Sequence, residues 1–263
     1  MKYGYLTLCQ QYGRIGQNRW EEEMAQQAIV GQMEEPTPVS SFTRVGAWAG
    51  VGFALVYISW IAIVISGPTF VEPGTALREF FAGGGGDDLR IGGFIVGAAY
   101  LFLLFPFVVA LEGAIEKTAD GWGRLAVLGA GIAVAVSLVD MVVGDVFALT
   151  GIEGLSDSAL ETIWTTGRLL IVWVFHLATG MWVAAASVGV LRGRALPRWL
   201  GWLGLALLIP QAVAASWLLG GTMNELHDAA GGIGQIGAFL VWIPAVSIAM
   251  LRHRRHELSR PQH

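Results

Sequence analysis

Charge and cysteine are both scarce in this sequence. Only 14% of the 263 residues are Asp, Glu, Lys or Arg, whereas about a quarter of the residues in a soluble globular domain are charged. The net charge of −4 provides no basic footprint, so we expect no nucleic-acid partner. The single cysteine, Cys9, excludes an internal disulfide and a cysteine-rich metal site.

Several motifs of membrane enzymes and cofactor carriers are also missing. The chain has no H-E-x-x-H zinc motif and no G-x-S-x-G nucleophile elbow. None of its long apolar stretches contains a lysine, which excludes a retinal Schiff base. Only one of them contains a histidine, which excludes bis-histidine haem within one chain. We therefore expect no cofactor, no metal and no catalytic residue, although the sequence leaves an enzymatic role open.

Apolar residues dominate instead, at 54% of the chain. Six stretches are long enough to cross a bilayer, which takes about 20 residues of apolar helix. They are residues 45–67, 91–111, 125–149, 165–191, 199–219 and 233–251. The alternating segments of about 10 residues that build membrane β-barrels are absent. The sequence predicts an all-α polytopic membrane protein, with a leader (1–44), a bundle of six transmembrane helices (45–251) and a basic tail (252–263).

The basic residues predict the orientation. If the N-terminus is cytoplasmic, the outer loops contain only Arg78 and Arg90, and the cytoplasmic segments contain thirteen basic residues. These are Lys2, Arg14, Arg19, Arg44, Lys117, Arg124, Arg192, Arg194, Arg198, Arg252, Arg254, Arg255 and Arg260. Positive charge accumulates on the cytoplasmic side of membrane proteins. We therefore expect an inner (plasma) membrane protein with both termini in the cytoplasm.

The same basic residues predict contact with lipid. Arginines next to a cytoplasmic membrane surface attract anionic headgroups. The residues expected to do so are Arg192, Arg194, Arg198, Arg252, Arg254 and Arg255. The bilayer is thus the first expected partner, and the composition is also compatible with a homo-oligomer or a larger membrane complex.

The leader is polar and differs from the rest of the chain. It contains no apolar core like that of a secretory signal, so we expect no cleaved signal peptide. Met24 and Met33 are in-frame alternatives to Met1 as the true start. We expect residues 1–40 to be poorly ordered.

The first outer loop contains two distinct segments. In P-G-T-A-L-R-E-F-F-A, residues 73–82, the side chains of Leu77, Phe80 and Phe81 share one face of a short helix. This pattern predicts a helix that lies on the outer membrane interface. The following G-G-G-G-D-D, residues 83–88, is typical of a flexible linker.

A glycine-rich segment near the C-terminus matches a nucleotide-binding pattern only formally. Residues 232–237 read G-I-G-Q-I-G, but they open an apolar span instead of following a strand. Small residues at this place favour close packing between membrane helices.

Asp140 and Asp145 lie in the third predicted span, and Arg168 and His176 lie in the fourth. A charged carboxylate at mid-bilayer costs about 2.5–3.5 kcal/mol on insertion scales, so each acid must face the bundle interior, find a partner or bind a proton. With a rise of about 1.5 Å per residue, Asp145 and Arg168 lie roughly 5–6 Å below the outer edge, and Asp140 and His176 roughly 14–16 Å below it. The sequence therefore predicts two depth-matched pairs, Asp145–Arg168 and Asp140–His176.

Helical rotation separates the two acids, because five residues correspond to about 140° around the axis. The third span has a polar stripe of Gly129, Ala133, Ser137, Asp140 and Gly144, and the fourth has one of Thr165, Arg168, Val172, His176 and Thr179. If these stripes face each other, Asp140 lies inside the bundle, and Asp145 either pairs with Arg168 or reaches the outer headgroups. Ser137 is expected to bond the carbonyl four residues earlier.

Three interpretations of these four ionisable residues remain open. They form a structural ion-pair network that fixes helix register, or they form a proton or substrate path in which Asp140 and His176 exchange protons. The third interpretation is a catalytic site, which lacks a nucleophile at the depth of His176.

Three prolines, Pro106, Pro210 and Pro244, lie inside predicted spans, where each frees a carbonyl and can kink its helix. We interpret them as packing features. Gln211 follows Pro210 and is expected either to satisfy a freed backbone group or to bond another helix.

Two further stretches carry a resemblance. Residues 175–182 read F-H-L-A-T-G-M-W, and residues 192–204 read R-G-R-A-L-P-R-W-L-G-W-L-G. They resemble a group of bacterial multi-pass membrane proteins, a domain-of-unknown-function family in which an F-x-x-H-like helix precedes a short basic loop and L-P-R-x-L-G. D-L-R-I-G-G-F, residues 88–94, is similar too. The resemblance implies a multi-pass fold and a bacterial inner membrane, but no reaction.

Together these features predict an integral membrane protein that moves or senses a small solute or a proton through Asp140, Asp145, Arg168 and His176. The alternatives are a membrane-embedded enzyme and a structural or accessory subunit of a membrane complex.

Overall fold

The computed structural model describes residues 41–65, 67–68, 72–116, 119, 121–150, 152–170, 174–193, 196–216 and 225–258. They belong to one compact unit that begins at Ser41. Within these ranges the regular structure is entirely helical. The first helix starts at Ser41, inside the predicted leader, and the last runs to Leu258, inside the predicted tail. The expectation for residues 1–40 lies outside the described residues.

The helices follow one another in a simple order. They are α2 (Ser41–Ile65), α3 (Gly74–Ala82), α4 (Gly85–Ala99), η1 (Tyr100–Leu104), α5 (Phe105–Glu116), α6 (Trp122–Thr150), α7 (Asp157–Leu170), α8 (His176–Arg192), α9 (Arg198–Ser216), α10 (Glu225–Ile236), η4 (Gly237–Trp242) and α11 (Ile243–Leu258). The segments η1 and η4 are π-helical and continue directly into α5 and α11.

Five helices in the described part of the chain are long and apolar enough to cross a membrane. They are Phe42–Ile63, Gly85–Glu116, Trp122–Val142, Arg198–Ser216 and Ala229–Arg252. They correspond to the first, second, third, fifth and sixth predicted spans, so the chain has the make-up of a multi-pass membrane protein. The span Gly85–Glu116 carries the two most exposed large apolar side chains, Phe94 at 77% and Phe102 at 74%, which would face lipid.

The predicted fourth span, residues 165–191, is distributed over two helices, α7 and α8, and residues 171–173 between them lie outside the described residues. Helix α8 has 17 residues, which corresponds to about 26 Å, slightly less than the bilayer core of about 30 Å. Five spans are therefore found where six are predicted, and the fourth predicted span stays a prediction.

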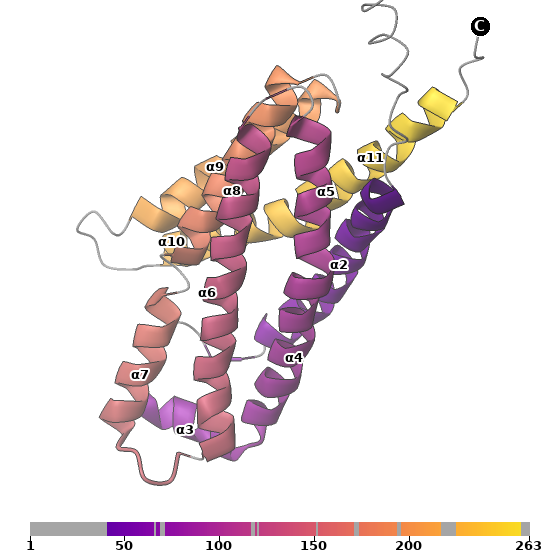
Figure 1. Cartoon of the computed structure of the whole chain (residues 1–263). Coiled ribbons are helices and arrows are strands. Elements are labelled where there is room, and N and C mark those ends of the chain that lie inside the picture. Colours follow the sequence, from indigo (N-terminus) through magenta and orange to yellow (C-terminus); the bar gives the residue numbers. More distant parts are fainter. Residues whose placement is uncertain are drawn as a thin grey trace, which may run out of the picture. The chain divides into compact units, whose positions relative to one another are not determined.

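The helices form a bundle in which neighbours along the chain pack together (Figure 1). Helix α2 packs against α4 and α5, and α6 packs against α4, α5 and α8. Helix α9 lies between α8 and α10. Helix α11 then returns to α2, so the last span contacts the first and closes the bundle.

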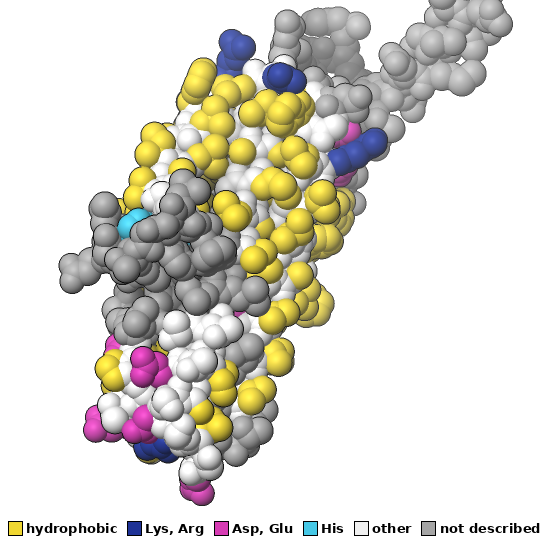
Figure 2. Space-filling model, turned by 90° about the vertical axis from the view of Figure 1, so that its left-hand side faces the viewer, with side chains coloured by type: hydrophobic (Ala, Val, Ile, Leu, Met, Phe, Trp, Pro, Cys, Tyr) yellow, Lys and Arg dark blue, Asp and Glu magenta, His cyan; other side chains and the backbone are white. Residues whose placement is uncertain are grey.

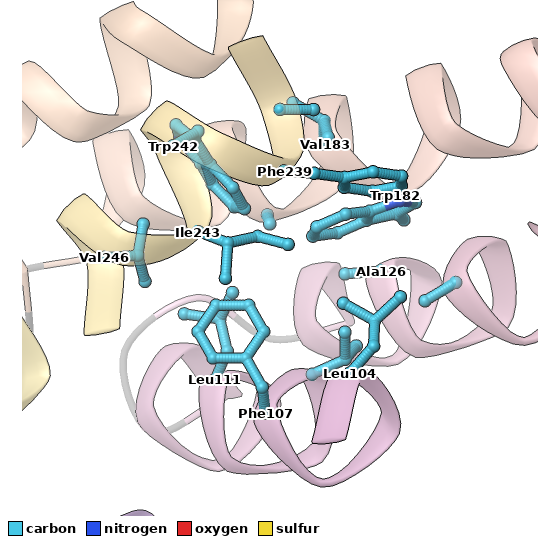
Figure 3. Close-up of a cluster of buried hydrophobic side chains, with 14 of the residues drawn as sticks. Leu104, Phe107, Leu111, Ala126, Trp182, Val183, Phe239, Trp242, Ile243 and Val246 are labelled. Carbon is cyan, nitrogen blue, oxygen red and sulfur yellow. The ribbon is translucent and has the colours of Figure 1, made fainter. Parts of the chain in front are cut away.

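The bundle core is rich in aromatic and branched side chains (Figure 3). Trp182 of α8 and Trp242 of η4 have ring centroids 5.4 Å apart, with their planes at 67°. The indole nitrogen of Trp242 donates a hydrogen bond of 2.9 Å to the carbonyl of Leu200 in α9. This bond satisfies the polar atom of a fully buried ring and ties α9 to the last span.

Two prolines follow the π-helical segments η1 and η4. Pro106 comes just after η1, and Pro244 comes just after η4. A proline has no N–H and its ring collides with the carbonyl four residues earlier, which here belongs to Phe102 in η1 and Leu240 in η4. A wider turn accommodates this lost bond, so the prolines account for the position of both π-helical segments.

Helix α3 confirms the predicted short helix, but α7 covers its apolar face. Leu77 is fully buried in a cluster with Leu160 and Trp164 of α7. Phe81 packs edge-on against Trp164, with centroids 5.9 Å apart. An interfacial position for α3 is not confirmed, because the side chains expected to contact lipid contact α7 instead.

Arg78 fastens α3 to the loop before α7. Its Nε donates a 2.8 Å hydrogen bond to Asp157 Oδ1. Its two Nη atoms donate to the carbonyls of Ile152 and Leu155. We call the assembly of α3, the loop 152–156 and the first half of α7 the outer cap, after the outer loop that the sequence predicts there.

The prediction of a flexible linker at residues 83–88 was wrong. Gly83 and Gly84 form a turn, and helix α4 already begins at Gly85. Gly84 has a φ of +90°, which favours glycine. Asp87 and Asp88 lie in the first turn of α4, where carboxylates interact favourably with the positive end of the helix dipole. The two acids thus support a helix start.

Exposed acidic side chains predominate at one end of the bundle, and exposed arginines gather at the other (Figure 2). The exposed acids Glu79, Asp87, Asp88, Glu153 and Glu161 lie at the end formed by the outer cap and the start of α4. Exposed arginines lie at the opposite end, where α2 begins, α8 ends and α11 ends. They include Arg44, Arg124, Arg192, Arg198 and Arg252. Apolar side chains cover much of the surface between the two ends.

Candidate functional site

A buried histidine joins two helices at the centre of the candidate site. His176 opens α8 and Gln211 lies in α9, and only 5% and 6% of their surfaces are exposed. Their side chains are hydrogen bonded, with 2.6 Å between His176 Nδ1 and Gln211 Oε1. Gln211 therefore bonds another helix, which confirms one of the two roles predicted for it.

Glycines of α10 form the wall beside this pair. A Cβ on Gly231 would lie 3.2 Å from His176 Nε2, and a Cβ on Gly234 would lie 3.0 Å from Gln211 Nε2. A Cβ on Gly237 would collide with Leu207 of α9. Close packing was predicted for the G-I-G-Q-I-G segment, and Gly234 and Gly237 confirm it. Gly232 in the same segment faces open space.

An aromatic cluster adjoins His176 on the side of the bundle axis. Phe175, the residue before it, has its ring centroid 6.4 Å from Tyr100 and 6.0 Å from Phe239. Phe53 of α2 lies 5.4 Å from both Tyr100 and Phe239. All four side chains are at least nine-tenths buried. The cluster fills the bundle between α2, η1, η4 and the start of α8.

Asp140 belongs to a second polar group, on α6. Ser137 Oγ donates a 3.0 Å hydrogen bond to the Ala133 carbonyl, as the sequence predicted. The buried Tyr100 hydroxyl lies within hydrogen-bonding reach of Ser137, and Asp140 is close enough to act on it electrostatically. A second buried tyrosine, Tyr57 of α2, contacts the same two rings as Tyr100, those of Phe53 and Phe239.

The structure places two of the four predicted ionisable residues. Asp140 is partly buried on α6, and His176 is buried on α8, the neighbour that packs along α6. A direct Asp140–His176 pair stays a prediction. The side chains of Asp145 and Arg168 lie outside the described residues, and so does their predicted pair.

One member of the polar stripe predicted on the third span, Gly129, lies against α8, and the orientation of the whole stripe stays a prediction. A Cβ on Gly129 would lie 2.8 Å from the Trp182 backbone nitrogen, and Ala133 and Ser137 are buried. On α8, Thr179 is buried as well, one turn beyond His176. Among the described residues, Thr179 Oγ1 and Gln211 Nε2 are buried without a hydrogen-bond partner. The interior around His176 therefore contains several polar groups with unused hydrogen-bonding capacity.

The tyrosines were not predicted as site residues. Tyr57 and Tyr100 each stand alone among apolar residues of their spans, and an amphipathic ring is common at the membrane surface. The available signal was their distance from the span ends, because Tyr57 lies well inside the first span and Tyr100 well inside the second.

No protein-family model matches the chain, and no curated protein or solved structure is significantly similar to it. The site itself must therefore carry the functional argument. The described residues include no group of three or more His, Cys, Asp and Glu side chains that could hold a metal ion. What the arrangement offers is a buried imidazole, which is a proton acceptor, in contact with an amide and close to an apolar wall.

Proposed function

We propose that this protein is a six-span inner-membrane protein of bacterial type that moves or senses a small solute or a proton, with His176 as its central exchangeable group. The observation that carries the proposal is the 2.6 Å contact between His176 Nδ1 and Gln211 Oε1 at a site with almost no exposed surface. Ionisable residues inside membrane bundles commonly mark proton or substrate pathways.

Histidine suits such a role because its charge changes near neutral pH. Asp140 on the adjacent helix and the Tyr100 hydroxyl provide further groups that can pass a proton. Three π-helical stretches also meet here, namely η1 with Tyr100, Val174–Phe175 before His176, and η4 with Phe239. Wider turns of this kind are frequent at functional sites.

The proposed orientation places the arginine end in the cytoplasm and the outer cap outside. The distribution of charge supports it, since positively charged residues favour the cytoplasmic side. Arg192 is held over the Trp122 ring, with its Cζ 5.0 Å from the ring centroid, which orients it at the expected headgroup level. Arg198 and Arg252 are exposed at the same end. The side chains of Arg194, Arg254 and Arg255 lie outside the described residues.

Reconstitution in liposomes tests the function. Vesicles containing a pH-sensitive dye receive an acid pulse while the membrane potential is clamped with valinomycin and potassium. We expect faster proton entry than in empty liposomes, and we expect His176→Gln to reduce it to the empty-liposome rate. Asp140→Asn should slow it as well. Glu161→Gln is the control, because it removes a titratable side chain that is exposed on α7, in the outer cap.

Each other outcome would overturn the proposal in a specific way. A wild-type rate equal to that of empty liposomes would exclude proton movement through the protein. An unchanged rate in His176→Gln, from protein that elutes as a single folded species, would exclude His176 as the exchangeable group.

A further inference from the structure

We infer that Gln211 is a positioning residue that holds the proton of neutral His176 on Nδ1, so that Nε2, facing α10, is the nitrogen that gains and loses a proton. The inference rests on the proposed function for its purpose. Its test does not, because the position of the proton is measured directly.

The first step concerns the hydrogen bond. A neutral imidazole has one N–H donor and one acceptor nitrogen, and an amide oxygen can only accept. Because Gln211 Oε1 lies 2.6 Å from Nδ1, the Nδ1–H group must donate to it. Nε2 is then the acceptor nitrogen of the neutral ring. The hydrogen bond that one ring nitrogen makes commonly decides which of the two nitrogens carries the proton.

The second step concerns the rigidity of Gln211. A Cβ on Gly234 would lie 3.0 Å from its Cγ, Cδ and Nε2, so the backbone of α10 rests against the carboxamide. The residue is 6% exposed. A side chain enclosed in this way has little freedom to turn its amide group away from His176.

The third step concerns the direction of Nε2. A Cβ on Gly231 would lie 3.2 Å from Nε2 and 3.3 Å from Cε1, so this edge of the ring faces the backbone of α10. His227 lies four residues before Gly231, on the same face of α10 and one turn closer to its N-terminal end. A proton that reaches Nε2 along α10 therefore passes His227.

Other titratable groups face the site from the helices packed around it. Among the described residues, these are Asp140 on α6, Tyr100 on η1 and His227 on α10. Gln211 differs from all three because it cannot exchange a proton itself. Gln211 orients the imidazole of His176, so its effect is measured on the protonation of that ring.

The test is ¹⁵N NMR of full-length protein, labelled at histidine and reconstituted in nanodiscs. The His176 signals are those that disappear in His176→Gln. At a pH where the ring is neutral, we expect a protonated, pyrrole-type Nδ1 and an unprotonated, pyridine-type Nε2. The opposite pattern would overturn the inference, because the amide NH₂ of Gln211 would then be the group that faces Nδ1.

Variants separate orientation from simple stability. Gln211→Glu retains an acceptor and should keep the proton on Nδ1, whereas Gln211→Leu should give a mixture of both tautomers. Gln235→Leu, on the neighbouring helix, should change nothing. Gly231→Ala should shift the Nε2 signal, and Gly232→Ala, whose Cβ would meet nothing within 4 Å, should not. A tautomer that is unchanged in Gln211→Leu would also overturn the inference.

The outcomes of the NMR experiment and those of the liposome experiment can be told apart. The expected tautomer without any proton flux would defeat the proposed function alone. Flux that depends on His176 together with a proton on Nε2 would defeat this inference alone.

Discussion

Gly129 of α6 lies so close to Trp182 of α8 that a Cβ on Gly129 would be 2.8 Å from the Trp182 backbone nitrogen. Two helices that carry candidate site residues thus touch backbone to backbone. Contacts of this kind stabilise membrane bundles, where small residues allow helices to approach. A Cβ on Gly131, two residues later and on nearly the opposite face of the same helix, would meet nothing within 4 Å.

The contrast between these two glycines gives a first prediction. Gly129→Ala should lower the free energy of unfolding by about 1–3 kcal/mol, because overpacking at a tight contact forces the helices apart. Gly131→Ala should leave it unchanged or raise it by at most about 1 kcal/mol, because alanine favours a helix over glycine. Thermal unfolding in a mild detergent measures both. Equal effects of the two substitutions would contradict the packing described between α6 and α8.

The hydrogen bond between α8 and α9 gives a second prediction. Gln211→Leu removes the hydrogen bond at His176 Nδ1, and His176→Leu leaves Gln211 Oε1 without that bond. Each should destabilise the protein by about 1–3 kcal/mol, since a buried polar group loses its bond. The double variant should be destabilised by clearly less than the sum of the two single effects, because it removes both polar groups of this hydrogen bond together. Full additivity would show that the two side chains are not coupled.

The outer cap gives a third prediction. Arg78→Gln removes the ion pair with Asp157 and at least one of the bonds to the loop carbonyls. Amide hydrogen exchange in α3 and in residues 152–156 should become faster, while exchange in α6 should not change. The control is Arg90→Gln, because within the described part of the chain Arg90 forms only an exposed pair with Asp87 of its own helix, at 3.2 Å. Faster exchange in the control as well would mean that Arg78 has no special role in the cap.

Much of the fold was predictable because apolar runs of membrane length have few competing explanations. The first, second, third, fifth and sixth predicted spans have counterparts in the structure. The packing role of the segment with Gly234 and Gly237 was also predictable, because no strand precedes it and the dinucleotide-binding motif requires one. The bond from Ser137 to Ala133 follows from local helix geometry alone.

The features of the fold and the site that could not be predicted depend on contacts between distant parts of the chain. The order of the spans predicted that the helix carrying His176 packs along α6, but it could not reveal that His176 Nδ1 bonds Gln211, 35 residues later. Four glycines in a row suggested flexibility, and only the turn at Gly84 and the acids in the first turn of α4 explain why a helix starts there. Tyr100 enters the site because η1 directs it toward Ser137, a π-helical turn that sequence periodicity does not show.

A fourth prediction concerns the orientation of the bundle, which underlies the proposed route of a proton. Cys9 is the only cysteine, so Cys9→Ser provides a cysteine-free background. In that background, Glu153→Cys in the outer cap and Arg198→Cys at the start of α9 both place a thiol at an exposed position. A membrane-impermeant maleimide should label Glu153→Cys in spheroplasts and should label Arg198→Cys only after the membrane is opened. The two positions lie at opposite ends of the bundle, so labelling of both in intact spheroplasts would indicate a mixed orientation or leakage. Labelling of Arg198→Cys alone would reverse the orientation, and His227 would then lie on the route from His176 toward the cytoplasm.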